Sequence, residues 1–319
     1  MVSNIVFTMN RPLQLYAYLE SLYACLLCVD MQTHILYRKD KFDEQYQDVF
    51  SRFPQIKVIA EQDLHDDLYD LLMGLDTPYV LFGTDDVVYF DGIDIDIVDQ
   101  AFRAYPETTF GFSMRLAPET LASSENYERL EIAGQTVFRI NWKTAEDRTA
   151  RYPFELDSTF YTTALVRQVL EPVAGESRFL QWLLFESPAA RVLRCFSSMK
   201  NLRASVYTYH KPNTFEGYCY RWCKTHKRLL PSHLLFQRLC ASAVQVNRVN
   251  TEIDNPIDGS EDHTVEAIND KFKQGYRLDI KFLQRNKPKV THVGRECFML
   301  DGGGTTPQAD EEGNECSEN

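Results

Sequence analysis

The chain lacks three features that would each point to a well-defined class of protein. It contains no Walker A pattern and no GxGxxG pattern. These absences argue against ATP hydrolysis by a P-loop enzyme and against dinucleotide binding by the usual glycine-rich loop. Its longest apolar runs, such as ACLLCV, are far too short to span a bilayer. The formal net charge is −12, so we do not expect a general nucleic-acid surface, which needs clustered lysine and arginine.

Signs of secretion are also missing. The opening stretch MVSNIVFTMN has no basic start and no long apolar run, and it reads as a first strand rather than a signal peptide. The eight cysteines are scattered along the chain, so reduced thiols are expected. We therefore expect a cytoplasmic protein without a transmembrane segment.

What the chain does have is a regular alternation of strand and helix patterns. With 44% hydrophobic and 25% charged residues, it has the composition of a soluble globular protein. The predicted strands are 4–9, 34–38, 56–61 and 79–83, and the helical patterns between them are 13–26, 43–53 and 63–75. This alternation predicts an α/β fold with a mostly parallel sheet flanked by helices.

The rest of the chain is less regular. The patterns predict a helix at 95–105 and a strand at 108–116, followed by a mixed region that includes 136–143 and 152–163. A helix at 164–171 and a mostly helical segment at 178–248 come next. The last residues are Gly-rich and acidic, which predicts a disordered tail. We predict three parts: an α/β nucleotide-sugar-binding part (1–175), a mostly helical acceptor-side part of the same globule (176–300) and the tail (301–319).

Two adjacent aspartates end the fourth predicted strand, in the stretch FGTDDVVYF. Ligands of α/β sheets bind beyond the carboxyl ends of the strands, and Asp85 and Asp86 follow that end directly. Two neighbouring carboxylates repel each other, and a hard divalent cation such as Mn²⁺ or Mg²⁺ would relieve the repulsion. The alternative is an acidic pair that ends a strand and points into water.

Several stretches, taken in order, resemble glycosyltransferases of the GT-A fold related to the large inverting family. They are TMNRPLQLYAYLESL, YVLFGTDDVVYF, FGFSMRL, YPFELDSTFYTT and, more weakly, VQVNRVN. The resemblance implies a metal-dependent transfer of a sugar from a nucleotide-diphosphate sugar to a glycan or other hydroxyl acceptor. It makes the TDD triplet a variant of the DxD metal-binding motif, although a full DxD would carry an acid at both ends.

The same resemblance implies roles for individual residues. Asp86 would be the metal ligand, with His210 as a later ligand, and Asp85 would face the ribose or the sugar. The other predicted nucleotide-binding residues lie at the ends of the first three strands or in the NRP loop; they are Thr8, Asn10, Arg11, Arg38 and Glu61.

An inverting transferase also needs a general base that takes the proton of the acceptor hydroxyl. Asp157, in FELDST, is the candidate, and Glu155 shares its strand face if the stretch is extended. A turn aspartate without a catalytic role is the alternative for Asp157. The segment YRWCKTHKRLLP (220–231) is basic and aromatic, and it could meet an anionic acceptor or diphosphate or form a solvated helix face.

Two other functions compete with this hypothesis. A nucleotidyltransferase also places a metal near carboxylates of an α/β sheet, but it would normally show a Gly-rich loop after the first strand, and TMNRPLQ has none. A non-catalytic protein that kept the fold is the third possibility.

Overall fold

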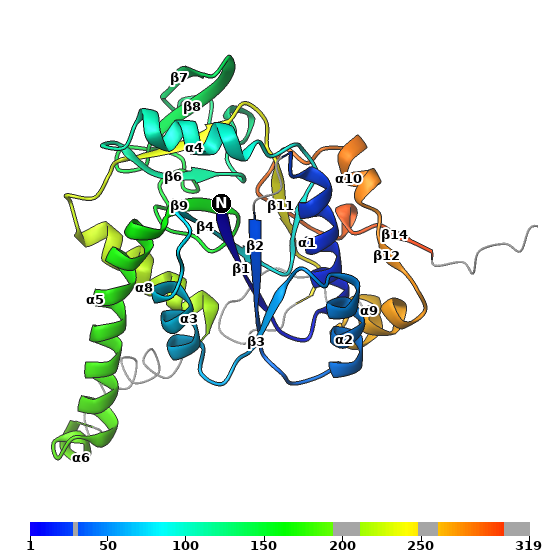
Figure 1. Ribbon diagram of the computed structural model, residues 1–319, viewed down its shortest axis with the longest axis horizontal. Helices are drawn as coiled ribbons and strands as arrows, with labels where there is room; N and C mark the ends of the chain where they lie inside the picture. Colours follow the sequence, from blue (N-terminus) through cyan, green and yellow to red (C-terminus); the bar gives the residue numbers. More distant parts are fainter. Residues whose placement is uncertain (28–30, 194–210, 248–260, 303–319) are drawn as a thin grey trace, which may run out of the picture.

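A computed structural model describes residues 1–27, 31–193, 211–247 and 261–302. Its centre is a nine-stranded sheet with the strand order β3-β2-β1-β4-β9-β6-β10-β8-β7, and helices cover both faces (Figure 1). The predicted α/β fold class is confirmed.

The first half of the sheet is parallel. Its strands are β1 (Val2–Thr8), β2 (Met31–Tyr37), β3 (Lys57–Ala60) and β4 (Tyr79–Thr84), joined by the helices α1 (Pro12–Cys25), α2 (Asp43–Arg52) and α3 (Leu64–Met73). All seven residues of β1 are buried, as expected for a central strand covered on both faces. Successive residues of β1 serve opposite faces, because Val6 joins one core cluster and Ile5 and Phe7 join the other.

The second half of the sheet is mixed. It contains β6 (Thr109–Ser113), β7 (Tyr127–Ile132), β8 (Gln135–Asn141), β9 (Thr159–Thr162) and β10 (Ser232–Phe236). Strand β9 runs antiparallel between β4 and β6, whereas β10 is parallel to β6 and antiparallel to β8. An antiparallel strand begins at the edge where its parallel neighbours end. The loop before β9 therefore lies beside the carboxyl ends of β4 and β6.

A smaller sheet joins β5 (Val87–Tyr89), β11 (Ala241–Val244) and β13 (His292–Val293), and β12 (Arg277–Leu278) pairs with β14 (Leu300–Asp301). The remaining α-helices of the described residues are α4 (Ile95–Ala104), α5 (Thr163–Gln181), α6 (Ala190–Leu193), α8 (Pro212–Thr225), α9 (Val265–Lys273) and α10 (Ile280–Arg285). None of the helices in the described ranges is long and apolar enough to cross a membrane.

The C-terminal part contains strands that the sequence analysis missed. Within the segment 178–248, β10 enters the main sheet and β11 pairs with β5. Both strands are short, and their residues are buried throughout, so they show no polar alternation that would reveal a strand. Parts 1–175 and 176–300 thus share one sheet, and the boundary at 175 stays a prediction.

The first residue of the predicted tail lies in a strand. Asp301 belongs to β14 and pairs with Arg277, so it is part of the folded chain. Residues 303–319 lie outside the described residues, and their disorder stays a prediction from composition.

Candidate functional site

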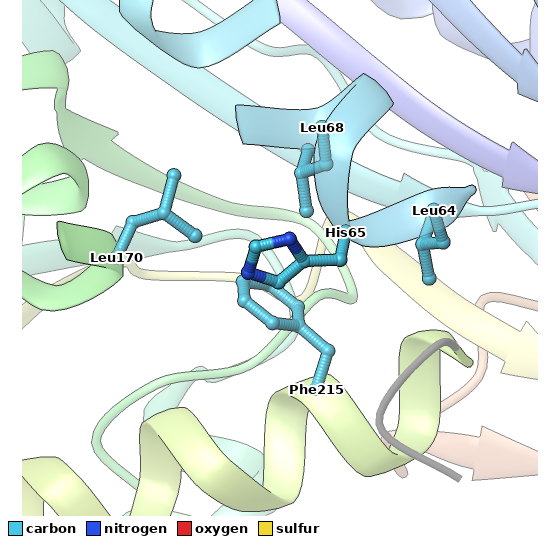
Figure 2. A pocket seen from close by; sticks show the side chains of 5 residues that line it. All are labelled: Leu64, His65, Leu68, Leu170 and Phe215. Carbon is cyan, nitrogen blue, oxygen red and sulfur yellow. The ribbon is translucent and has the colours of Figure 1, made fainter. Parts of the chain in front are cut away.

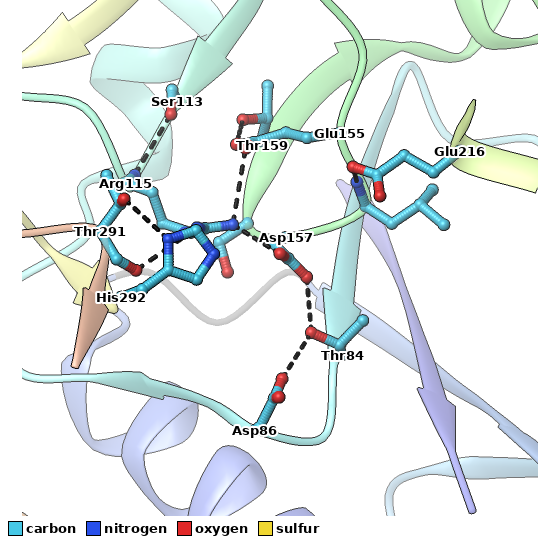
Figure 3. A network of polar contacts seen from close by, with 12 residues as sticks. Thr84, Asp86, Ser113, Arg115, Glu155, Asp157, Thr159, Glu216, Thr291 and His292 are labelled. Carbon is cyan, nitrogen blue, oxygen red and sulfur yellow. Dashed lines mark hydrogen bonds and ion pairs between the residues drawn. The ribbon is translucent and has the colours of Figure 1, made fainter. Parts of the chain in front are cut away.

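Polar side chains from distant parts of the chain meet at the carboxyl edge of the main sheet. They come from the loop after β1, the turn after β4, the segment after β6 and the loop before β9, and the network they form is drawn in part in Figure 3. The turn after β4 is held by two backbone hydrogen bonds, from Asp85 N to Phe7 O (3.2 Å) and from Val244 N to Asp86 O (2.7 Å). The acidic pair is therefore fixed between β1 and β11.

The two adjacent aspartates occupy different environments. The side chain of Asp85 is 5% exposed, and that of Asp86 is 17% exposed. Asp85 accepts hydrogen bonds from Thr8 Oγ1 (2.9 Å), Met9 N (3.4 Å) and Arg11 Nη1 (3.1 Å). Asp85 thus ties the loop after β1 to the turn after β4, while Asp86 lies closer to solvent.

Arg11 is buried and bonds to both aspartates. Its Nη1 lies 3.2 Å from Asp86 Oδ2, and its Nε and Nη2 donate to the side chain and backbone of Asn247 at 2.9 and 2.6 Å. Burial lowers the pKa of Arg11, but the charges of Asp85 and Asp86 outweigh burial and raise it. The guanidinium therefore stays charged and holds the acidic pair in place. Direct contact of Arg11 with a nucleotide stays a prediction.

Asp86 and Asp157 converge on one hydroxyl group. Thr84 Oγ1 lies 2.9 Å from Asp86 Oδ1 and 2.5 Å from Asp157 Oδ1 (Figure 3). A threonine hydroxyl has one proton, so it donates to only one of these carboxylates at a time. The carboxylate oxygen that receives no proton then faces the lone pairs of the hydroxyl oxygen. A shared proton or a cation at this point would relieve the repulsion between these oxygens.

Arg115 holds Asp157 from the other side. Its Nη1 lies 2.6 Å from Asp157 Oδ2 and 3.5 Å from Glu155 Oε2, and its Nη2 donates to His292 Nε2 (2.9 Å) and to Thr291 O (3.3 Å) (Figure 3). Burial lowers the pKa of Arg115, but Asp157 and Glu155 raise it above its ordinary value. Arg115 thus fixes the predicted base and links it to β13.

The backbone before β9 is strained at the residue after the predicted base. Ser158 has φ = 64°, a left-handed conformation that costs a non-glycine residue free energy. It is kept by hydrogen bonds from Ser158 N to Phe82 O (2.8 Å) and between Ser158 Oγ and the Tyr89 hydroxyl (2.8 Å). This kink sets the direction of Asp157 toward Thr84.

Two more carboxylates lie beside Asp157. Glu155 accepts a 2.5 Å hydrogen bond from Thr159, and Glu216 of α8 accepts from the backbone N–H of Leu156 at 3.3 Å (Figure 3). Burial raises the pKa of Glu155. Burial, together with the charges of Asp157 and Glu155, raises the pKa of Glu216 well above its ordinary value. Two carboxyl groups whose surroundings favour the protonated form therefore lie beside Asp157.

The other predicted nucleotide-binding residues lie farther along the same edge. Asn10, with φ = 59°, accepts from Lys41 N and donates to Asp40, both at 2.8 Å. Arg38 and Glu61 directly follow β2 and β3 and form an ion pair at 3.8 Å. The structure thus places them at the edge of the sheet without testing their roles. His210 lies outside the described residues.

Arg115 and Glu216 were not among the residues predicted from the sequence. Arg115 lies within the segment FGFSMRL, two residues after β6 ends. Its position directly after a buried strand could have marked it as a site residue. Glu216 lies on a helix far along the chain, and no local pattern marks it.

A second acidic group lies at the start of α3. Ligand atoms of Asp63, His65 and Asp66 lie within 4.8 Å of one another. The Asp63 carboxylate caps the helix, since it accepts from the backbone N–H groups of His65 and Asp66. This arrangement is explained by helix capping, and we assign it no ligand.

A small hollow lies beside this helix start. It is lined by Leu64, His65, Leu68, Leu170 and Phe215, from α3, α5 and α8 (Figure 2). Four of its five lining side chains are apolar, and the residues of the acidic network do not line it. It is therefore separate from the candidate site.

Comparison with known proteins supports the expected resemblance. No protein-family model matches the chain. Over 179 residues it is 25% identical to the bifunctional glycosyltransferase pgtA of Dictyostelium discoideum. The aligned segment covers 49% of this chain and 23% of that protein. The predicted resemblance to glycosyltransferases is confirmed by this relative. The chain spans only about a quarter of the relative's length.

Solved structures overlap with the chain only in part. The Staphylococcus aureus protein TarS has 14% identity and a TM-score of 0.38, over 53% of this chain and 29% of its own. The mannosyltransferase PcManGT from Pyrobaculum calidifontis, solved in complex with GDP-Man and Mn²⁺, has 12% identity and a TM-score of 0.34, over 54% of this chain and 46% of its own.

Proposed function

We propose that this protein is a metal-dependent glycosyltransferase of the GT-A type that moves a sugar from a nucleotide-diphosphate sugar to a hydroxyl acceptor with inversion. The observation that carries the proposal is the convergence of Asp86 and Asp157 on the hydroxyl of Thr84. The similarity to a glycosyltransferase supports it.

The donor set fits a hard divalent cation. Oxygen ligands suit Mn²⁺ and Mg²⁺, and the single proton of Thr84 leaves one of the two facing carboxylate oxygens without a donor from this hydroxyl. Asp86, the more exposed of the adjacent aspartates, would hold the ion. When bound, such an ion stabilises the negative charge that a nucleoside diphosphate gains on leaving.

The protein's own groups supply the proton transfer and its geometry. Asp157 takes the proton of the acceptor hydroxyl as that oxygen forms its bond to the anomeric carbon and the diphosphate leaves. Arg115 and Thr84 position Asp157, since both bond to its carboxylate. Arg11 positions the acidic pair, and Thr8, Asn10, Arg38 and Glu61 are proposed to line the donor nucleotide's place along the sheet edge.

Calorimetry of UDP and GDP binding, with Mn²⁺ and with a chelator, tests this function. Wild type should bind one nucleotide more tightly with Mn²⁺, and Asp86→Ala should lose that gain. NMR of a transfer or hydrolysis product made from the matching nucleotide sugar should then show an inverted anomeric configuration.

Two results would contradict the proposal in different ways. Equal nucleotide affinity in Mn²⁺ and in chelator would remove the metal from the mechanism. A product that retains the donor's configuration would leave a transferase but remove the need for Asp157 as a single base.

A further inference from the structure

One face of α8 leads away from the proposed base toward a group of cations. Glu216, Tyr220 and Lys224 are spaced four residues apart on this helix, so they lie on the same face. At a rise of about 1.5 Å per residue, the face runs for about 12 Å from Glu216 to Lys224. Glu216 bonds to the backbone of Leu156, next to Asp157, so the face begins at the site.

The middle of this face is an aromatic pair. Tyr220 stacks on Tyr152 with ring centroids 4.5 Å apart and an interplanar angle of 15°, and both residues are partly exposed. Burial raises the pKa of Tyr152, and the nearby charges of Glu216, Glu155 and Asp157 raise it further. The rings are therefore next to the carboxylates of the site, and they offer flat apolar surface with polar tips.

The far end of the face is cationic. Lys224 Nζ lies 5.6 Å from the ring centroid of Trp142 and 6.0 Å from that of Tyr220. Lys227 and Arg228 lie three and four residues later, just beyond the end of α8, and are exposed. Within the described residues, no carboxylate forms an ion pair with Lys224, Lys227 or Arg228. In a chain of net charge −12, this concentration of uncompensated cations attracts an anionic group.

We propose that this face of α8 binds the acceptor, and that the acceptor is a saccharide whose sugar unit carries a negatively charged group, a phosphate or a carboxylate. The reacting hydroxyl lies at Asp157, the sugar ring packs on Tyr152 and Tyr220, and the anionic group meets Lys224. The inference rests on the proposed transferase function for the identity of the reacting end, but saccharide binding can be measured without turnover.

The test uses a panel of methyl hexosides with the corresponding hexuronides and hexose 6-phosphates, and binding to the full chain is followed by saturation-transfer NMR. Wild type should bind charged members more tightly than their neutral counterparts. Lys224→Met should weaken the charged members about three- to fivefold and leave the neutral ones unchanged, since one exposed charge pair contributes little more. Raised salt should reduce the same difference, and Lys224→Arg should restore it.

The aromatic pair has a separate signature. Tyr220→Ala should weaken neutral and charged members alike, by about tenfold, whereas Tyr220→Phe keeps the ring and should bind as wild type does. Lys273→Met is the matched control, because Lys273 is a half-exposed lysine of α9, on the opposite side of the molecule in Figure 1. It should change nothing.

Three results overturn the inference. One is the absence of saccharide binding in a protein that still binds nucleotide sugar. Another is equal binding of charged and neutral members. The third is Lys224-dependent binding to phosphatidylserine vesicles by a protein that binds none of the saccharides, which would make this face of α8 a membrane contact. Donor binding is measured separately by calorimetry, so charge-selective saccharide binding without any nucleotide affinity would reject the transferase and keep the saccharide site.

Discussion

The two adjacent aspartates should respond in opposite ways to the same chemical change. Asp85→Asn and Asp86→Asn each remove one charge and keep the shape of the side chain. Asp85 is buried and accepts from Thr8, Met9 N and Arg11, whereas Asp86 is more exposed and shares Thr84 with Asp157. We expect the first substitution to reduce stability and the second to reduce metal-dependent nucleotide binding.

The expected magnitudes follow from these contacts. Removing one partner of a buried ion pair costs about 3–5 kcal/mol, and Arg11 keeps a second carboxylate 3.2 Å away in Asp86. Burial outweighs the attraction of Arg11 and raises the pKa of Asp85 to about 6, so desolvation offsets part of what this charge contributes. Asp85→Asn should therefore lower the free energy of unfolding by less than these figures, by about 1–3 kcal/mol. In Asp86→Asn the buried pair of Arg11 with Asp85 remains, and the amide oxygen can still accept from Thr84. Asp86→Asn should therefore lower the free energy of unfolding by only about 1 kcal/mol.

Urea unfolding followed by circular dichroism measures the first effect, and calorimetry of UDP and GDP with and without Mn²⁺ measures the second. Asp86→Asn should fold almost as stably as wild type and lose most of the gain in affinity that Mn²⁺ gives. The reasoning fails if Asp85→Asn unfolds at the wild-type urea concentration. It fails equally if both variants lose the same stability and the same affinity, because the two environments would then be equivalent.

Three further predictions concern the base, the packing and the pH dependence. Asp157→Asn should lower the transfer rate about 10²- to 10⁴-fold while the calorimetric nucleotide affinity stays near wild type; an unchanged rate would move the role to Glu155. Gly83→Ala should lower the free energy of unfolding by about 1–3 kcal/mol, because the new Cβ would lie 2.2 Å from the Tyr18 hydroxyl. The control is Gly217→Ala, whose Cβ would meet nothing within 4 Å, and it should be neutral or slightly stabilising. Burial lowers the pKa of His233 to about 4, so in this range the unfolded chain binds a proton at this residue and the folded protein does not. The free energy of unfolding should therefore fall as pH drops from 6.5 to 4, by up to about 1.4 kcal/mol per pH unit from this group. Urea unfolding at a series of pH values measures this slope, and a His233→Gln variant that keeps the wild-type slope would contradict the prediction.

The first half of the fold could be predicted because its signals are local. Strands β1 to β4 and their helices each carry a complete periodic pattern, and the rule that ligands bind at the carboxyl ends of strands located Asp85 and Asp86. The sequence also named Asp157 as the candidate base, but its contact with Thr84 came only from the structure. These predictions needed only short stretches of sequence.

The parts that were missed depend on contacts between distant segments. Strand β10 is buried between β6 and β8, and nothing in its five residues distinguishes a central strand from a helix turn. Arg115 and Glu216 gain their importance from Asp157 and Leu156, 42 and 60 positions away. The distinct environments of Asp85 and Asp86 likewise arise from distant residues. Thr8 and the backbone of Met9 bond to Asp85, whereas Asp86 shares Thr84 with Asp157.

The variant triplet finds a physical explanation in the structure. A full DxD motif would carry a carboxylate at position 84, but this chain has a threonine there. The hydroxyl of Thr84 instead bonds to Asp157, which lies 73 positions later in the sequence and is held by Arg115 and by the left-handed backbone of Ser158. A second carboxylate therefore reaches the place beside Asp86 from the loop before β9. In the proposed mechanism this brings the metal-holding residue and the base to the two sides of one hydroxyl. Thr84 then fixes the separation of the donor and acceptor ends of the site.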